Sequence, residues 1–288
     1  MKLKYLFAGI LLSIFISAGP ASASFSSLVS FGDSLSDNGD GDGFGYGRYT
    51  DSYASIWVET LALINGGASL YDYAYGGATT GLENLVTPDS TGLTSQVTDS
   101  DILADIVSQG LDYSDTLFTI WAGGNDIRYG TNPYTAAANI INALSSLAGI
   151  GAEYFLVPNL PDPAMTPSIY YNTEYTAEEK QMISVWADIF NNTLLAGLTA
   201  FADANSDVSV YFLDVETIFN EFSPGDTSWE LLFWDYDGYH PSFTGHTLIA
   251  QAAAGVLAGD PIPSSVPVPG AAVLMASGLM VLVRVRRR

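Results

Sequence analysis

Short apolar segments alternate with longer amphipathic segments along most of this chain. The apolar segments have the length of buried strands and lie at 28–32, 70–74, 116–121, 154–158 and 208–213. The amphipathic segments have the period of helices and lie at 52–64, 94–109, 134–148, 176–204 and 242–257. Because parallel strands need a long crossover, usually a helix, this alternation predicts an α/β fold, a three-layer α/β/α sandwich around a five-stranded parallel sheet.

Length and composition favour one folded unit between two terminal segments. The chain has 288 residues, of which 48% are hydrophobic, and no change of composition divides its middle. We therefore expect a single domain at 24–260.

The segment 1–23 has the layout of a secretory signal peptide. Lys2 and Lys4 precede an apolar run at 5–16, and small residues follow at 21–23. An N-terminal membrane anchor is the alternative, but the run is shorter than the roughly 20 residues that a spanning helix needs. We expect cleavage after Ala23 and an exported protein.

The segment 261–288 contains a Pro- and Ser-rich linker, an uncharged stretch at 271–283 and four terminal arginines. Arginines after a short apolar stretch stay on the cytoplasmic side of a membrane. The part 266–288 resembles the PEP-CTERM sorting tail of Gram-negative bacteria, which a membrane protease trims. This resemblance implies a protein that is secreted or held at the cell surface, with membrane contact only through the tail. A plain C-terminal anchor is the alternative.

The domain between these segments is strongly acidic. Arg48, Arg128 and Lys180 are its only basic residues against all 31 acidic ones, a net charge of −28. Such a surface repels phosphate backbones and anionic headgroups, which argues against nucleic acid as a partner and favours a neutral substrate. Acidity that only maintains solubility is the alternative.

The chain has no cysteine, which excludes disulfides, thiolate nucleophiles and zinc-thiolate sites. Asp37, Asp40 and Asp42 are spaced like calcium ligands, but Phe44 and Arg48 stand where further ligands belong. We therefore expect no metal site.

Polar and glycine-rich residues gather where ligands bind in open parallel sheets, beyond the carboxyl ends of the predicted strands. They lie at 32–34, 76–77 and 123–126, and at 237–240 before the last predicted helix. Ser34 is a candidate nucleophile, but a serine hydroxyl needs a neighbouring base. His240 fits this role because Asp237 lies three residues before it, whereas His246 falls in an apolar helical pattern that favours a packing or capping role.

Acyl transfer from an ester also needs donors for the oxygen that becomes negative. The candidates are the backbone N–H of Ser34, the N–H of Gly77 and the side-chain amide of Asn125. Which of Gly76 and Gly77 donates stays open at this point. Asp126, beside Asn125, is expected to accept loop amides rather than to act in catalysis.

Four segments together resemble the blocks of the GDSL, or SGNH, esterase and lipase superfamily. They are Phe-Gly-Asp-Ser-Leu at 31–35, Gly-Gly at 76–77, Gly-Gly-Asn-Asp at 123–126 and Asp-Gly-Tyr-His-Pro at 237–241. The segments 32–39 and 157–162 are similar to a branch with many secreted esterases, lipases and phospholipases. The resemblance implies a flavodoxin-like fold without a cofactor. It also implies Ser34, Asp237 and His240 as catalytic residues and Ser34, Gly77 and Asn125 as the oxyanion hole.

The sequence thus predicts a secreted or surface-anchored serine ester hydrolase that forms an acyl-enzyme with lipid or short-chain carboxylic esters. A carbohydrate O-deacetylase is a second possibility that family membership does not separate from the first. A catalytically silent surface-binding module, retained by its tail, is the third.

Overall fold

Five parallel strands form the centre of the computed structural model, which describes residues 24–39, 48–52, 54–86 and 91–262. The strands are β1 (Ser27–Gly32), β2 (Ser69–Asp72), β3 (Thr116–Trp121), β4 (Tyr154–Pro158) and β5 (Ser209–Leu213). Their order in the sheet is β2-β1-β3-β4-β5, with every neighbouring pair parallel. This is the flavodoxin-like order, so the predicted fold is confirmed.

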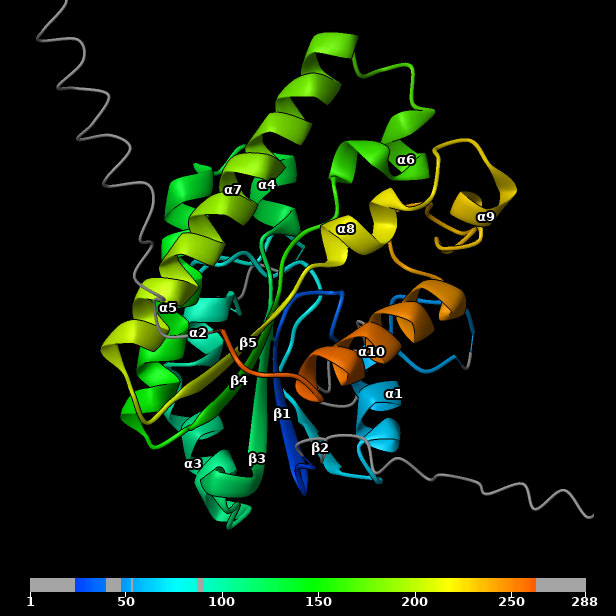
Figure 1. Cartoon of the computed structure of the whole chain (residues 1–288). Helices are drawn as coiled ribbons and strands as arrows, with labels where there is room; N and C mark the ends of the chain where they lie inside the picture. Colours follow the sequence, from blue (N-terminus) through cyan, green and yellow to red (C-terminus); the bar gives the residue numbers. More distant parts are fainter. Residues whose placement is uncertain (1–23, 40–47, 53, 87–90, 263–288) are drawn as a thin grey trace, which may run out of the picture.

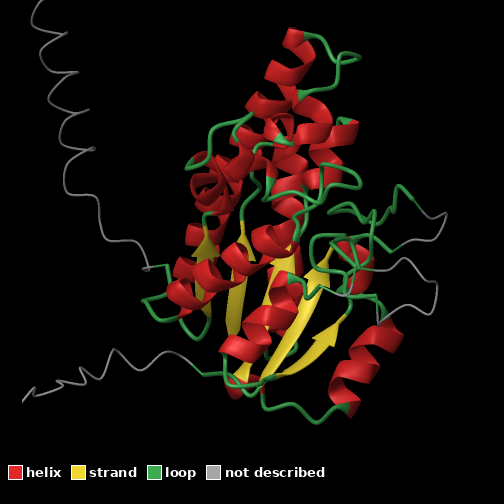
Figure 2. Cartoon of the chain, turned by 90° about the vertical axis from the view of Figure 1, so that its right-hand side faces the viewer, coloured by secondary structure: helices red, strands yellow, loops and turns green. Residues whose placement is uncertain are grey.

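Helices cover both faces of the sheet (Figures 1 and 2). On one face α1 (Trp57–Ile64) packs against α10 (Phe243–Leu257). On the other face α5 (Pro133–Gly149) packs against α2 (Leu93–Gln96) and α7 (Ala177–Ala204). β1 and β3 are buried along their whole length, as expected for central strands between two helical layers.

The loops that follow the strands carry short helices that the sequence pattern did not predict. These are α4 (Gly124–Tyr129), α6 (Pro167–Tyr170), α8 (Val215–Asn220) and α9 (Thr227–Glu230), with a 3₁₀ turn at Pro163–Met165; a second 3₁₀ turn, Tyr113–Asp115, directly precedes β3. Figure 1 shows α4, α6, α8 and α9 gathered at one end of the molecule. Helices of four to six residues bury too few apolar side chains to produce a periodic signal.

Two predicted helices have different limits in the structure. The helix expected at 94–109 is broken between α2 and α3 (Ser100–Ser108), because the Asp99 carboxylate accepts the N–H groups of Asp101 and Ile102 and so starts a new helix. The helix expected at 52–64 begins only at Trp57. Its start is fixed by Glu59, whose Oε2 accepts the N–H of the extended residue Ile56 at 2.9 Å.

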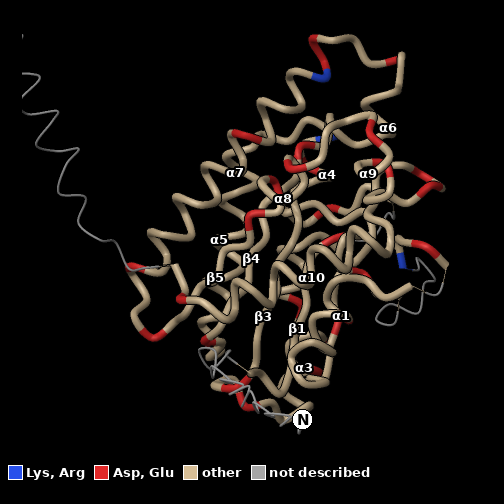
Figure 3. The backbone as a smooth tube through the Cα atoms, turned by 45° about the vertical axis from the view of Figure 1, so that its right-hand side comes forward, with Lys and Arg blue, Asp and Glu red and all other residues tan. Residues whose placement is uncertain are grey.

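Asp and Glu residues are spread along the described chain, in which Arg48, Arg128 and Lys180 are the only Lys or Arg residues (Figure 3). Within the described ranges, no helix combines the length and apolar character needed to cross a membrane. The predicted signal peptide, nearly all of the predicted tail, and Asp40 and Asp42 lie outside the described residues.

Candidate active site

Ser34 lies in a tight turn directly after β1. The turn begins at Gly32, whose φ is +145° and where an added Cβ would lie 2.1 Å from the carbonyl oxygen of Trp121 on β3, so that only glycine fits. The carbonyl of Asp33 then accepts the N–H groups of Ser36 and Asp37. This turn holds Ser34 at the carboxyl end of the central strand, with 7% of its surface exposed.

The loop before α10 presents His240. Asp237 Oδ1 accepts the N–H groups of Tyr239 at 2.8 Å and His240 at 3.1 Å, which closes a short turn. The His240 carbonyl accepts the N–H of Trp234 at 2.8 Å, which pins the other end of the loop. The second carboxylate oxygen, Asp237 Oδ2, lies 2.6 Å from His240 Nδ1.

The two loops bring three of the predicted residues into a continuous chain of hydrogen bonds. Ser34 Oγ lies 2.7 Å from His240 Nε2, and His240 Nδ1 lies 2.6 Å from Asp237 Oδ2. A carboxylate at Nδ1 favours the tautomer that keeps the proton there and leaves Nε2 free to accept the serine proton. Burial alone would raise the pKa of Asp237, but the hydrogen bond and charge of His240 with two backbone N–H groups lower it, so the carboxylate stays ionised.

The three predicted oxyanion donors differ in how they are already used. Among the described residues, neither the N–H of Ser34 nor that of Gly77 has an acceptor. The N–H of Gly76 is occupied, because it donates to Asp37 Oδ2 at 2.7 Å. The side-chain amide of Asn125 donates one of its two protons to the carbonyl of Ala78 at 3.0 Å. This bond orients the side chain and leaves the second amide proton for another acceptor. The structure therefore favours Gly77 over Gly76 as a donor.

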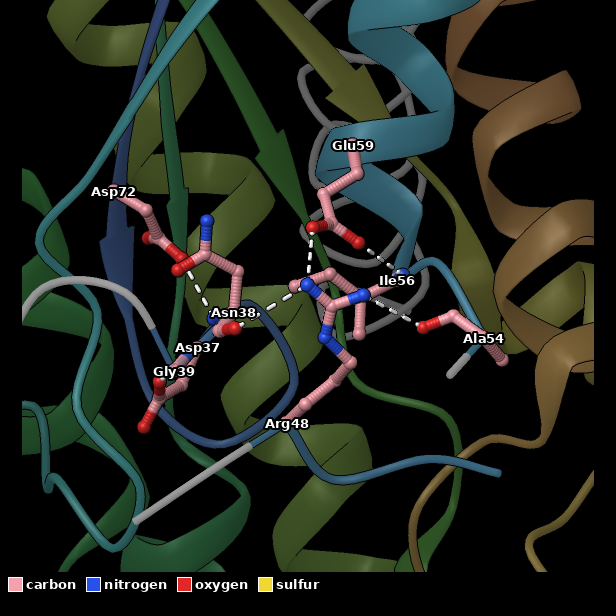
Figure 4. Close-up of polar contacts among 8 residues, drawn as sticks. All are labelled: Asp37, Asn38, Gly39, Arg48, Ala54, Ile56, Glu59 and Asp72. Carbon is pink, nitrogen blue, oxygen red and sulfur yellow. Dashed lines mark hydrogen bonds and ion pairs between the residues drawn. The ribbon is translucent and has the colours of Figure 1, made fainter. Parts of the chain in front are cut away.

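Buried carboxylates hold the loops that carry these donors. Asp37 Oδ1 accepts the N–H of Gly39, and Asp37 Oδ2 accepts the N–H of Gly76. These two bonds tie the nucleophile turn to the Gly76–Gly77 loop; Asp37 and Gly39 are drawn in Figure 4. Asp126 accepts both the N–H and the hydroxyl of Thr80 at 2.8 Å. The predicted structural role of Asp126 is thus confirmed.

The same burial changes how these acids ionise. Desolvation raises the pKa of Asp33 to about 7, assisted by the neighbouring charges of Asp126 and Asp37, while the backbone N–H of Leu35 opposes it. Desolvation also raises the pKa values of Asp72 and Asp126. The scaffold beneath the candidate site therefore carries carboxyl groups that resist ionisation.

The second histidine has the role that its sequence context predicts. His246 on α10 is fully buried, and its Nδ1 accepts the N–H of Trp57, the first residue of α1, at 3.2 Å. Desolvation lowers the pKa of His246 to about 3, so the ring stays neutral. It joins two helices and does not contact Ser34.

The chain matches a known enzyme family over most of its length. The family model of the GDSL-like lipases and acylhydrolases matches residues 28–253. The chain belongs to this GDSL family. The match extends over the sheet and every loop of the candidate site, and the family makes this GDSL protein a carboxylic ester hydrolase.

Individual relatives of the GDSL hydrolase are distant. An acetylesterase of Thermothelomyces thermophilus is 26% identical over 213 residues, which are 66% of this chain and 70% of the relative. Lipase 1 of Photorhabdus luminescens is 27% identical over 190 residues, 59% of this chain but only 27% of the lipase. A solved member of the lipolytic G-D-S-L family from Veillonella parvula aligns with a TM-score of 0.51 at 16% identity, over 80% of this chain and 97% of that one, and supports the fold alone.

The GDSL hydrolase thus has its predicted site residues at one edge of the sheet, while their catalytic roles remain predictions. Two residues of the site were not predicted. The sequence suggested Asp37 only as a possible calcium ligand. Tyr49, whose ring lies against that of His240, belongs to none of the four sequence blocks. In the described residues no three His, Asp or Glu side chains are placed to hold a metal ion.

Proposed function

We propose that this GDSL hydrolase is an exported serine esterase that cleaves lipid or short-chain carboxylic esters through an acyl-enzyme. The observation that carries the proposal is the hydrogen-bonded chain from Ser34 Oγ through His240 to Asp237, with contacts of 2.7 and 2.6 Å. These are the distances at which a base takes a serine proton and a carboxylate orients the base.

In the first half-reaction, Ser34 Oγ attacks the ester carbonyl while His240 Nε2 takes the hydroxyl proton. The carbonyl oxygen becomes negative, and the N–H groups of Ser34 and Gly77 with the Asn125 amide stabilise it. When the tetrahedral intermediate collapses, His240 returns the proton to the leaving alcohol. Asp237 stays ionised and stabilises the imidazolium in between.

In the second half-reaction, water takes the place of the alcohol. His240 Nε2 removes a proton from the water, the hydroxide attacks the acyl-enzyme, and the proton passes to Ser34 Oγ as the acid leaves. The catalytic groups return to their starting state, so this route needs no cofactor. Activity should fall in acid, because a protonated imidazole no longer accepts the serine proton.

Two features support the substrate class and the site of action. The acetylesterase relative is aligned over 70% of its own length, and its name favours a short-chain ester as the substrate of this chain. The 1–23 segment supports export, and the 261–288 segment supports retention or sorting at the surface.

A substrate panel tests this function. We expect p-nitrophenyl acetate and butyrate to be hydrolysed by the mature domain and not by Ser34→Ala. Rising acyl-chain length and an acetylated polysaccharide, run beside them, separate the candidates. Turnover of long chains favours a lipase, and turnover restricted to acetate esters favours the O-deacetylase. Absence of turnover on every ester would contradict the proposal and favour the silent binding module.

A further inference from the structure

Tyr49 lies against both the candidate base and the Gly76–Gly77 loop. The centres of the Tyr49 and His240 rings are 4.9 Å apart and the planes differ by 33°, so the phenol ring lies against the imidazole in a tilted contact. The Tyr49 hydroxyl end reaches Gly76, where an added Cβ would lie 2.1 Å from it. One aromatic side chain therefore spans from the base to the loop that carries an oxyanion donor.

The segment 48–51, which we call the strap, is firmly held in this position. Arg48 binds Glu59 on α1 at 2.6 Å and donates to the carbonyl of Ala54 at 2.9 Å and that of Asn38 at 3.5 Å (Figure 4). At the other end, Asp51 Oδ2 accepts the N–H of Phe243, the first residue of α10, at 2.7 Å. The strap is thus tied to the nucleophile turn and to both helices of one face.

The buried His246 packs beside the strap. Its ring lies beside the backbone of Tyr49, its Nε2 has no hydrogen-bond partner among the described residues, and its Nδ1 accepts the N–H of Trp57. A neutral ring in this place adds no positive charge next to His240. The position of Tyr49 is therefore set by contacts on both of its sides rather than by its own side chain alone.

The contact between the Tyr49 and His240 rings has a chemical consequence. The face of an aromatic ring carries the negative part of its quadrupole and attracts a cation placed over it. His240 becomes such a cation each time it takes the proton of Ser34 or of water. Asp237 meets this charge in the plane of the imidazole, and Tyr49 meets it from the face.

We propose that Tyr49 is a positioning residue that holds the imidazole of His240 and stabilises its protonated form during both half-reactions. This inference rests on the proposed role of His240 as the base. It adds to that role a residue outside the four GDSL blocks.

The other groups around His240 do not supply this contact. Tyr239 meets the imidazole edge-on, with ring centres 5.4 Å apart and planes at 85°, and the Arg128 guanidinium lies over Tyr239 at 4.8 Å. Ser34 and Asp237 occupy the two ring nitrogens. Among the described residues, the Asp33 carboxyl lies near Tyr239, and the neutral His246 lies near His240.

The pH dependence of kcat/KM for p-nitrophenyl acetate, measured on Tyr49→Leu and Tyr49→Phe, tests the proposal. We expect Tyr49→Leu to lower the plateau about 5- to 20-fold and to move the acid limb about 0.5 to 1 pH unit toward lower pH, since both follow from a less stable imidazolium. Tyr49→Phe keeps the ring face and should stay within about threefold of the wild type on both measures. Arg48→Gln should shift the profile in the same direction as Tyr49→Leu.

Tyr236→Leu is the matched control, because Tyr236 is 83% exposed in the His240 loop and stacks only on Trp234 among the described rings. It should leave the profile unchanged. A plateau loss in Tyr49→Leu with an unmoved acid limb, or equal losses in Tyr49→Phe and Tyr49→Leu, would overturn the proposal. His240→Ala in the same series examines the proposed function separately, because wild-type turnover by that variant would reject the base itself.

Discussion

Asp37 Oδ2 accepts the N–H of Gly76 at 2.7 Å, and this bond distinguishes two adjacent glycine amides. One amide is used by the scaffold, and the next one, of Gly77, has no acceptor among the described residues. A carboxylate of the turn that carries Ser34 thereby helps to position the proposed oxyanion donor on a different loop. The bond thus ties the turn of Ser34 to the loop of Gly77.

Replacing Asp37 by asparagine should impair turnover more than binding. Asparagine has one carbonyl oxygen for two N–H donors, so either Gly39 or Gly76 loses its acceptor and the oxyanion loop is less well fixed. We expect kcat to fall about 10- to 100-fold with KM within about threefold, measured with p-nitrophenyl acetate. Asp99→Asn, which alters a carboxylate that caps a distant exposed helix, is the control and should keep wild-type kcat. Equal effects of the two substitutions would contradict a specific role of Asp37.

Gly77 and Gly67 form a natural pair for a second experiment. Both have φ of +83°, so alanine is strained at either position by about 1–2 kcal/mol. An added Cβ at Gly67 meets nothing within 4 Å, whereas at Gly77 it would lie 2.5 Å from Val86 and 2.6 Å from Asn84. We expect both alanine variants to lose thermal stability, but only Gly77→Ala to lose about 100-fold or more in kcat. A fully active Gly77→Ala would remove this amide from the oxyanion hole.

Asp33 should make stability depend on pH in a defined direction. Its pKa is about 7 in the folded protein against 3.8 for a free aspartate side chain, so between these values the folded state holds a proton that the unfolded chain has lost. The free energy of unfolding therefore falls as pH rises from about 4 to about 7, by up to about 1.4 kcal/mol for each pH unit. Asp33→Asn does not titrate, so its Tm relative to the wild type should rise across this window. A constant Tm difference from pH 4 to pH 8 would show that the folded and unfolded pKa values are alike.

The sheet was predictable because its strands are short apolar runs with clear ends. All five predicted strands are present with ends shifted by at most two residues, and the long helices α5, α7 and α10 agree with their periodic patterns to within one residue. The break at Asp99 could not be read from periodicity, since apolar residues continue on both sides of it. It depends on one side chain accepting two backbone N–H groups.

The site residues that lie in short sequence motifs could be predicted from the sequence. His240 lies within hydrogen-bond distance of both Ser34 and Asp237, the two residues that the blocks pair with it. The choice between Gly76 and Gly77 needed the structure, because it depends on a carboxylate 39 residues away. Tyr49 was missed for a similar reason. Its contact with His240 joins two segments that are far apart in the chain, and neither the residue type nor its spacing predicts this contact.

Ser34 is the nucleophile that forms the acyl-enzyme in the proposed reaction. The decisive measurement is labelling of the protein with a fluorophosphonate, followed by mass spectrometry of its peptides. We predict a single modification at Ser34 that abolishes ester hydrolysis, with no labelling of Ser34→Ala or His240→Ala under the same conditions. Labelling at another serine, or hydrolysis by Ser34→Ala at the wild-type rate, would contradict the account.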